Sequence, residues 1–197
     1  MGQPPPPSTS ADVPPASTRG LSHPKRYITD HDSEGNAIFS TALPEEIPFE
    51  QIPNDAIFSL CYATNESPVL LNDNADVNVY SNYLNNLPGV MIPGGTVLRM
   101  VDLPPGATSP MHRTVSLDYG VVLEGEIELI LDKGATRLMK RGDMSVQRGT
   151  IHAWKNASAD GKWARMLYIL QESKPLEIAG QELGEDYGGL QVPKSQN

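Results

Sequence analysis

The chain has 197 residues, a formal net charge of −9, and 18 prolines with 17 glycines. This length suits one domain with tails, and so many helix-interrupting residues favour short strands joined by turns over a helix bundle. The acidic surface argues against a nucleic-acid partner, no apolar run approaches the ~20 residues that span a bilayer, and the single cysteine, Cys61, rules out an internal disulfide framework or a thiolate metal site.

Residues 1–26 contain seven of the prolines and few large apolar residues. Such a segment buries too little apolar surface to offset its ordering entropy, so we expect a disordered, proline-rich arm. Its first ten residues lack the charged start and the apolar stretch of a secretory signal. Together with the lone cysteine, which fits a reducing compartment, this predicts a cytoplasmic protein.

Residues 27–95 give mixed signals and are expected to form strands and loops that pack on a more regular half. Residues 27–39 predict a short hairpin with its turn at 33–36, and residues 56–63 predict a strand. Residues 72–86 are rich in Asn and Asp, and two interpretations stay open for them: a lid over a barrel mouth or a long surface loop.

Residues 96–174 form the regular half, in which short segments of alternating polarity are separated by Gly and Pro turns. Six or so strands at such close spacing indicate a sandwich or a small barrel. Residues 175–197 are expected to form a tail of loop with some edge contacts. The predicted strands cover residues 96–103, 118–125, 126–132, 135–140, 144–147, 152–154 and 163–170.

Two of the four histidines, His112 and His152, begin strands of this half. The first lies in PPGATSPMHRTVSLDYGVVLEGEIEL and the second in RGDMSVQRGTIHAWKN. These stretches resemble the two signature motifs of the cupin superfamily. At the positions of the first motif this sequence has Gly106, His112, Thr114, Asp118 and Gly125. At those of the second it has Gly142, Gly149, His152 and Asn156, with Arg148 in place of a proline. The resemblance covers residues 96–170 and implies an all-β, single-domain cupin jelly-roll barrel, or double-stranded β-helix.

The resemblance also implies a candidate metal site. In metal-binding cupins, two histidines and a glutamate of the first motif join the histidine of the second to hold a divalent ion. Here His112 and His152 occupy the first and last ligand positions, Thr114 replaces the second histidine, and Asp118 replaces the glutamate. The remaining set, His112, Asp118 and His152, suits Fe, Zn, Mn or Ni. Because one ligand is lost, a metal-free site in which the same three residues move protons stays open.

Five further residues are predicted to contact a substrate. Thr114 shares the strand face of His112, and Trp154 shares that of His152, where its indole would stack on an aromatic ring. Tyr119 offers a phenolic proton, and Met100 and Met166 are expected to line the apolar interior.

The motif variants are similar to small single-domain cupins of fungal and bacterial secondary-metabolite pathways. That likeness implies a tailoring enzyme acting on a small aromatic or polyketide-like molecule by a lyase-type step, dehydration or decarboxylation, with or without isomerisation or cyclisation. Two alternatives stay open, an Fe(II)-dependent dioxygenase or other oxidative enzyme, and a non-catalytic ligand-binding cupin. We expect a homodimer, because many cupins pair through their sheets.

Overall fold

The computed structural model describes residues 16–52 and 56–190. Most of the predicted arm, residues 1–15, lies outside this part of the chain. The remainder of the arm begins with a short helix, α1 (Ala16–Arg19), and then places Leu21 in the core. Within the described ranges, no helix combines the length and the apolar character needed to cross a bilayer.

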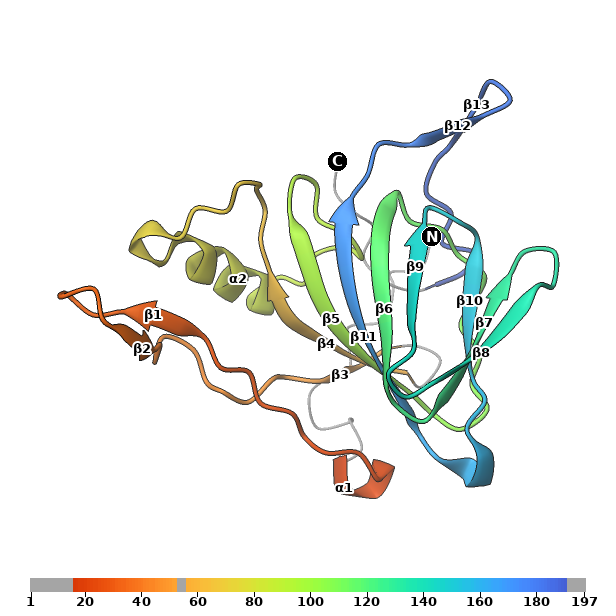
Figure 1. The fold of residues 1–197 in the computed structure, drawn as a ribbon, viewed down its shortest axis with the longest axis horizontal. Helices are drawn as coiled ribbons and strands as arrows, with labels where there is room; N and C mark the ends of the chain where they lie inside the picture. Colours follow the sequence, from red (N-terminus) through yellow and green to blue (C-terminus); the bar gives the residue numbers. More distant parts are fainter. Residues whose placement is uncertain (1–15, 53–55, 191–197) are drawn as a thin grey trace, which may run out of the picture.

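Two antiparallel sheets build an open barrel (Figure 1). The larger sheet has the strand order β3-β4-β5-β11-β6-β9, and the smaller has the order β10-β7-β8. This arrangement confirms the predicted all-β, single-domain jelly roll. The strands of the larger sheet are β3 (Glu50–Gln51), β4 (Ile57–Ala63), β5 (Thr96–Leu103), β11 (Ala164–Glu172), β6 (Ser116–Glu124) and β9 (Met144–Arg148). Those of the smaller sheet are β10 (His152–Asn156), β7 (Glu126–Leu131) and β8 (Thr136–Lys140).

Alternation along the strands fills the barrel interior with apolar side chains. Val101 and Leu103 of β5 pack with Trp154 of β10 and Met166 of β11 in one buried cluster. Gly125 makes the turn between β6 and β7 with φ +80°, and a Cβ there would lie 2.5 Å from the Ser158 Oγ atom. The turn therefore requires glycine. The buried cluster also contributes to the wall of an internal cavity, since Val101, Leu103 and Trp154 belong to both.

The barrel extends further toward the N-terminus than the predicted boundary at residue 96. Strand β4 pairs with β5 from Ile57 opposite Asp102 to Ala63 opposite Val97, with an irregularity between Leu60 and Tyr62. Residues 57–63, part of the segment that was expected to pack on the barrel, are therefore one of its strands. Both faces of β4 are largely buried, so its sequence lacks the polar alternation that marks a half-exposed strand.

Two hairpins lie outside the barrel sheets. The predicted one is present as β1 (Thr29–His31) and β2 (Ala37–Phe39), and its turn is held by Asp32 Oδ1, which accepts from the Glu34 and Asn36 amides at 2.9 Å each. The second, β12 (Leu176–Ile178) with β13 (Gln181–Leu183), forms where a loop was expected.

Residues 72–86 are neither a lid nor an irregular loop. A 3-10 turn, η2 (Asn72–Asn74), leads into helix α2 (Ala75–Asn85), which packs on β4. Tyr80 is fully buried and its hydroxyl donates to the Leu60 carbonyl at 2.8 Å. The helix shares its core cluster with Val90 and Leu170, two cavity-lining residues, so it lies behind the cavity wall.

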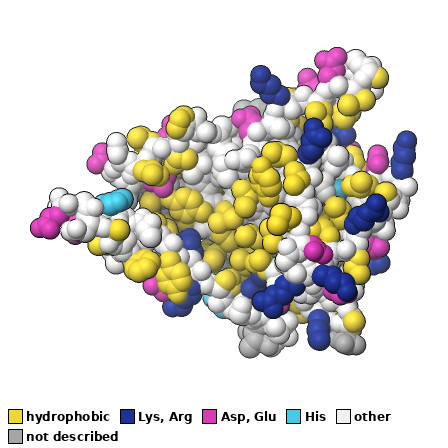
Figure 2. Space-filling model, in the orientation of Figure 1, with side chains coloured by type: hydrophobic (Ala, Val, Ile, Leu, Met, Phe, Trp, Pro, Cys, Tyr) yellow, Lys and Arg dark blue, Asp and Glu magenta, His cyan; other side chains and the backbone are white. Residues whose placement is uncertain are grey.

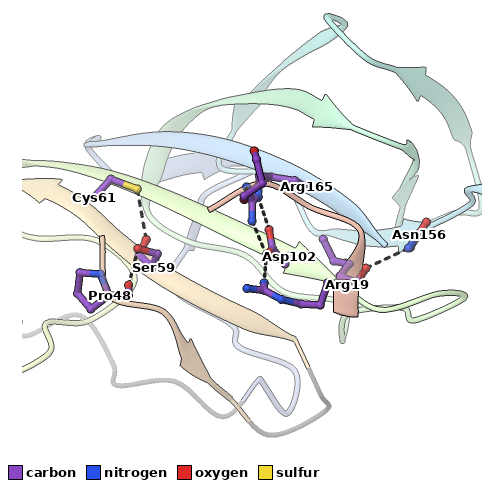
Figure 3. A network of polar contacts seen from close by, with 9 residues as sticks. Arg19, Pro48, Ser59, Cys61, Asp102, Asn156 and Arg165 are labelled. Atoms are coloured by element: carbon purple, nitrogen blue, oxygen red, sulfur yellow. Dashed lines mark hydrogen bonds and ion pairs between the residues drawn. The ribbon is translucent and has the colours of Figure 1, made fainter. Parts of the chain in front are cut away.

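A buried ion cluster fixes residues 16–22 to the barrel (Figure 3). Asp102 of β5 is fully buried and accepts from Arg165 Nε at 2.5 Å and Arg165 Nη2 at 2.7 Å, and it also pairs with Arg19. Arg165 Nη1 donates in addition to the Ser22 carbonyl at 2.7 Å. The cluster thus ties α1 to two strands of the larger sheet.

Candidate functional site

A cavity lies inside the barrel and is lined by side chains of both sheets and of the loops at one end. Most of its wall is apolar, with Phe58, Val101, Leu103 and Leu170 among the lining residues. The polar side chains on the wall include Arg99, Ser109, His112, Thr114, Asp118, Gln147, His152 and Tyr168.

His112 and His152 are held together by their own backbones. The His112 amide donates to the His152 carbonyl at 2.9 Å, and the His152 amide donates to the His112 carbonyl at 3.0 Å. Directly opposed residues in such a bridge project their side chains to the same side. Their ring centroids are accordingly 4.4 Å apart, and both residues are buried.

Each imidazole is oriented by a second hydrogen bond. Nδ1 of His112 lies 2.9 Å from the Pro110 carbonyl oxygen, and Nδ1 of His152 lies 2.9 Å from that of Thr150. Because a carbonyl oxygen can only accept, Nδ1 carries the proton and Nε2 keeps its lone pair in the neutral ring. Each histidine therefore presents Nε2 as the nitrogen available to a ligand.

Burial keeps both imidazoles neutral near pH 7. It lowers the pKa of His112, although the hydrogen bond to Pro110 opposes the shift. Burial, together with the neighbouring His112, lowers the pKa of His152 to about 4. Because the two rings are in contact, a proton added to one of them makes a second proton on the other unfavourable.

Asp118 on β6 adds a carboxyl group to the two imidazoles of the cavity wall. Burial raises the pKa of this carboxyl to about 6, against the opposing effect of hydrogen bonds from Ser116 and Thr114. Thr114 Oγ1 donates to Asp118 Oδ2 at 3.3 Å, whereas Oδ1 has no partner among the described residues. About a tenth of Asp118 is thus protonated at pH 7, and more at lower pH, while its buried Oδ1 has no hydrogen-bond partner in the part of the chain that the structure describes.

The three candidate metal ligands are not grouped into one site. Among residues 16–52 and 56–190, no three or more His, Cys, Asp or Glu side chains are grouped so that they would hold one ion. The two imidazoles stand together, but the Asp118 carboxyl is not grouped with them and is bound on the Thr114 side. The donor set therefore does not fit a two-histidine, one-carboxylate centre.

Two of the five predicted substrate contacts line the cavity. Thr114 lies on the wall, and the Trp154 ring stands edge-on to His152, with their centroids 5.3 Å apart. The other three lie elsewhere. Tyr119 follows the inward-facing Asp118 and so projects from the outer face, where it is exposed. Met100 packs outside the barrel with Phe49.

Met166 does face inward, but it belongs to the packed core rather than the cavity wall. It is fully buried and its Sδ accepts from the Tyr168 hydroxyl at 3.0 Å. It thus supports Tyr168, which itself lines the cavity and which the motif-based prediction missed.

Arg99 is another wall residue that was missed. It takes the inward position on β5 between Val97 and Val101, whereas Met100 takes the outward one. The segment Thr96–Leu103 is apolar at both parities, so alternation did not identify its inner face. A charged residue flanked by apolar neighbours of the same parity was the available signal.

A jelly-roll barrel with paired histidines on the wall of an internal cavity is the architecture of the cupins. A cupin-domain family model matches residues 99–169. The chain is 51% identical over 164 residues to phomopsin biosynthesis cluster protein D of Diaporthe leptostromiformis, covering 83% of this chain and 86% of that protein. It is 39% identical over 183 residues to the cupin-domain-containing oxidoreductase srdB of Neurospora crassa, covering 93% and 91%. The chain belongs to the cupin family.

Among solved structures, the cupin domain of Schizosaccharomyces pombe Cnp3 aligns with 76% of this chain and 88% of that chain. The identity is 14% and the TM-score is 0.45.

Proposed function

We propose that this cupin is an enzyme of natural-product biosynthesis that carries out a lyase-type step on a small organic molecule by acid–base chemistry. The observation that carries the proposal is the pair of neutral imidazoles, each presenting Nε2, in the same cavity as a carboxylic acid whose pKa is near neutrality. Relatives that are named for biosynthesis clusters support the pathway context.

When the surroundings lower the pKa of one group and raise that of another, the first can act as a base and the second as an acid. In a dehydration, His112 Nε2 takes a proton from a carbon next to a carbonyl group, and the C–H electrons form a carbon–carbon double bond. The adjacent C–O bond breaks, and the departing hydroxyl takes the Asp118 proton and leaves as water. A proton returning from His112 to Asp118 restores the site.

The remaining wall residues support this chemistry. His112 lowers the pKa of the neighbouring His152, so His152 stays neutral when His112 takes up a proton. The apolar wall, including Phe58, Val101 and Leu170, excludes water from the reacting atoms and suits an aromatic or polyketide-like body.

A second candidate function is oxidation or reduction of the same class of molecule. It is favoured by the name of the srdB relative, a cupin-domain-containing oxidoreductase. Oxygen uptake that depends on added Fe(II), together with stoichiometric iron in the purified protein, would support this candidate over the lyase.

The proposal includes two properties of the whole protein, a homodimer and a cytoplasmic location. The homodimer is supported by apolar side chains on the outer surface of β6 and β9, where Tyr119, Met144 and Val146 are exposed. The cytoplasmic location is supported by the reduced, buried Cys61.

The deciding experiment compares metabolites in the producing organism after deletion of the gene and its replacement by wild type or His112→Gln. For the proposed lyase, the deletion and the variant accumulate one compound heavier than the wild-type product by a single water or carbon dioxide. A difference of two hydrogens or of oxygen atoms indicates the oxidoreductase. Full restoration by His112→Gln would overturn catalysis at this site and leave a ligand-binding protein.

A further inference from the structure

Arg99 is a buried positive charge on the cavity wall. It lies on the inner face of β5, is 8% exposed, and has Val97 and Val101 as its neighbours of the same parity. Across the β5–β11 ladder it stands directly opposite Tyr168, which lines the same cavity. Arg99 therefore borders the cavity in which a ligand of the proposed enzyme would lie.

The contacts of Arg99 leave its charge uncompensated. Its Nη2 donates to the Gly89 carbonyl at 3.1 Å, and its Cζ lies 5.6 Å from the centroid of the Phe58 ring. No carboxylate of a described residue forms an ion pair with it. A single carbonyl and an aromatic face satisfy only part of a group that has five N–H donors.

Two other buried arginines form ion pairs with a carboxylate on the opposite face of the same strand. Arg19 and Arg165 both pair with Asp102, which is fully buried. Arg99 has no such partner, although it is equally removed from water. Burial of an unpaired charge is costly, and a ligand group of opposite charge in the cavity would offset that cost.

Arg99 stays charged in this environment. Burial lowers the pKa of its guanidinium to about 10, so the group is protonated at neutral pH. The cavity consequently combines one fixed cation with a largely apolar wall, two neutral imidazoles and the Asp118 carboxyl.

We propose that Arg99 binds an anionic oxygen group of the ligand, and that the substrate class of this cavity is small organic acids whose bodies are otherwise apolar. The inference rests on the proposed function, because it takes the same cavity as the substrate site. A guanidinium pairs with a carboxylate through charge-assisted hydrogen bonds, and the exclusion of water strengthens them.

The position of the charge also bears on the reaction. A carboxylate held by Arg99 is stabilised before reaction, which opposes its own loss as carbon dioxide. Between the two lyase steps, Arg99 therefore favours dehydration, with the bound carboxylate serving to orient the substrate toward His112 and Asp118.

The test is a binding experiment that does not need turnover. Hexanoate, benzoate and cinnamate, each beside its neutral primary amide, are titrated by calorimetry into the purified wild type, Arg99→Met and Arg99→Lys. Arg137→Met, on the exposed face of β8, is the control for loss of one positive charge. Thermal unfolding of every variant checks that the fold is retained.

The expected result is that at least one acid binds the wild type and Arg137→Met roughly tenfold or more tighter than its amide. Arg99→Met should lose this preference while its affinity for the amide stays the same, and Arg99→Lys should keep part of it because the charge remains. No binding of any acid at millimolar concentration, equal affinity for acid and amide, or a preference that survives in Arg99→Met would overturn the inference.

The two proposals fail separately. Failure of the lyase is seen in the metabolites of the His112→Gln strain, whereas failure of acid recognition is seen in these titrations. An acid preference that depends on Arg99, in a protein whose His112→Gln variant is fully active, would identify an acid-binding cupin without the proposed chemistry.

Discussion

Arg19 and Asp102 lie 83 positions apart in the sequence, yet they form an ion pair in which both side chains are removed from water. Asp102 also holds Arg165 on the neighbouring strand. One carboxylate therefore compensates two guanidiniums and joins the segment before the barrel to its largest sheet.

Replacement of Asp102 by Asn should leave two buried guanidiniums without a carboxylate. Removing one partner of a buried ion pair costs about 3–5 kcal/mol, which is a large part of the stability of a domain of this size. Urea unfolding measures the loss. Lys25→Met, which removes an exposed pair with Glu45, is the control and should leave the urea midpoint unchanged. A loss below about 1 kcal/mol for Asp102→Asn would contradict the structural role of the cluster.

The cupin motifs carried most of what the sequence predicted. The resemblance to these motifs implied the barrel and the pair His112 and His152, whereas alternating polarity between Gly and Pro turns predicted the strands from Thr96 onward. The strand at 57–63 and the hairpin at 27–39 were also predicted, since short apolar runs beside turn residues mark both.

Elements without such markers were missed for physical reasons. Helix α2 is rich in Asn and Asp, which have low helix propensity, and its stability comes from packing Val77 and Tyr80 against β4. The 3.6-residue spacing of Val77, Tyr80 and Leu84 was the available signal. Met100 was assigned to the wrong face, and Arg99 was not identified, because both faces of β5 carry apolar side chains.

The pH dependence of stability should reveal that the pKa values of Asp118 and His152 are shifted in opposite directions. The pKa of Asp118 is raised to about 6 in the folded protein, so between pH 4 and 6 the folded state binds the extra proton and stability falls as pH rises. The pKa of His152 is lowered to about 4, so over the same range the unfolded state binds the extra proton and stability rises with pH. The two contributions oppose each other in the wild type.

Asp118→Asn removes one of these contributions. The difference in unfolding free energy between variant and wild type should therefore increase by about 1 kcal/mol per pH unit from pH 4 to 6 in favour of the variant. Urea unfolding at half-unit pH steps measures this slope. His152→Gln should shift the slope in the opposite direction, and parallel curves for all three proteins would show that neither group is perturbed.

Catalysis should require a neutral His112 and a protonated Asp118. With the substrate in hand, His112→Gln is expected to lower kcat/KM by about 10²–10⁴-fold, the usual contribution of a general base. The wild-type rate should fall above pH 6 as Asp118 loses its proton. Tyr119→Phe, on the outer face, is the matched control and should keep both the rate and the pH profile. A rate that rises steadily through pH 8 would contradict the acid role of Asp118.

The absence of a side chain at Gly120 leaves space for the ring of Tyr168 at the cavity wall. A Cβ at Gly120 would lie 2.8 Å from Ser145 Oγ, 3.1 Å from Tyr168 Cε1 and 3.3 Å from Met166 Cε. Gly120→Ala should therefore push the Tyr168 ring from its place and destabilise the fold by about 1–3 kcal/mol through overpacking. Gly184→Ala, where nothing lies within 4 Å of the added Cβ, should be neutral in the same urea experiment. Equal midpoints for the two variants would mean that the wall around Tyr168 is not tightly packed.

The outer surface of β6 and β9 is where we expect two copies to meet. Met144 is 72% exposed and Val146 54% exposed on β9, beside Tyr119 of β6, and β9 is an edge strand of the large sheet. Figure 2 shows further hydrophobic side chains gathered over the middle of the face in view. Contiguous exposed apolar patches of this kind mark interaction sites.

A charge in that surface should separate the copies. Multi-angle light scattering is expected to give twice the chain mass for the wild type and the single chain mass for Val146→Glu, because a carboxylate at a symmetric interface meets its own copy or loses its hydration. Leu138→Glu, at an exposed position on β8 in the other sheet, is the matched control and should stay dimeric. A wild type that is monomeric at working concentration would remove the dimer. Dissociation by Leu138→Glu but not by Val146→Glu would move the interface to the smaller sheet.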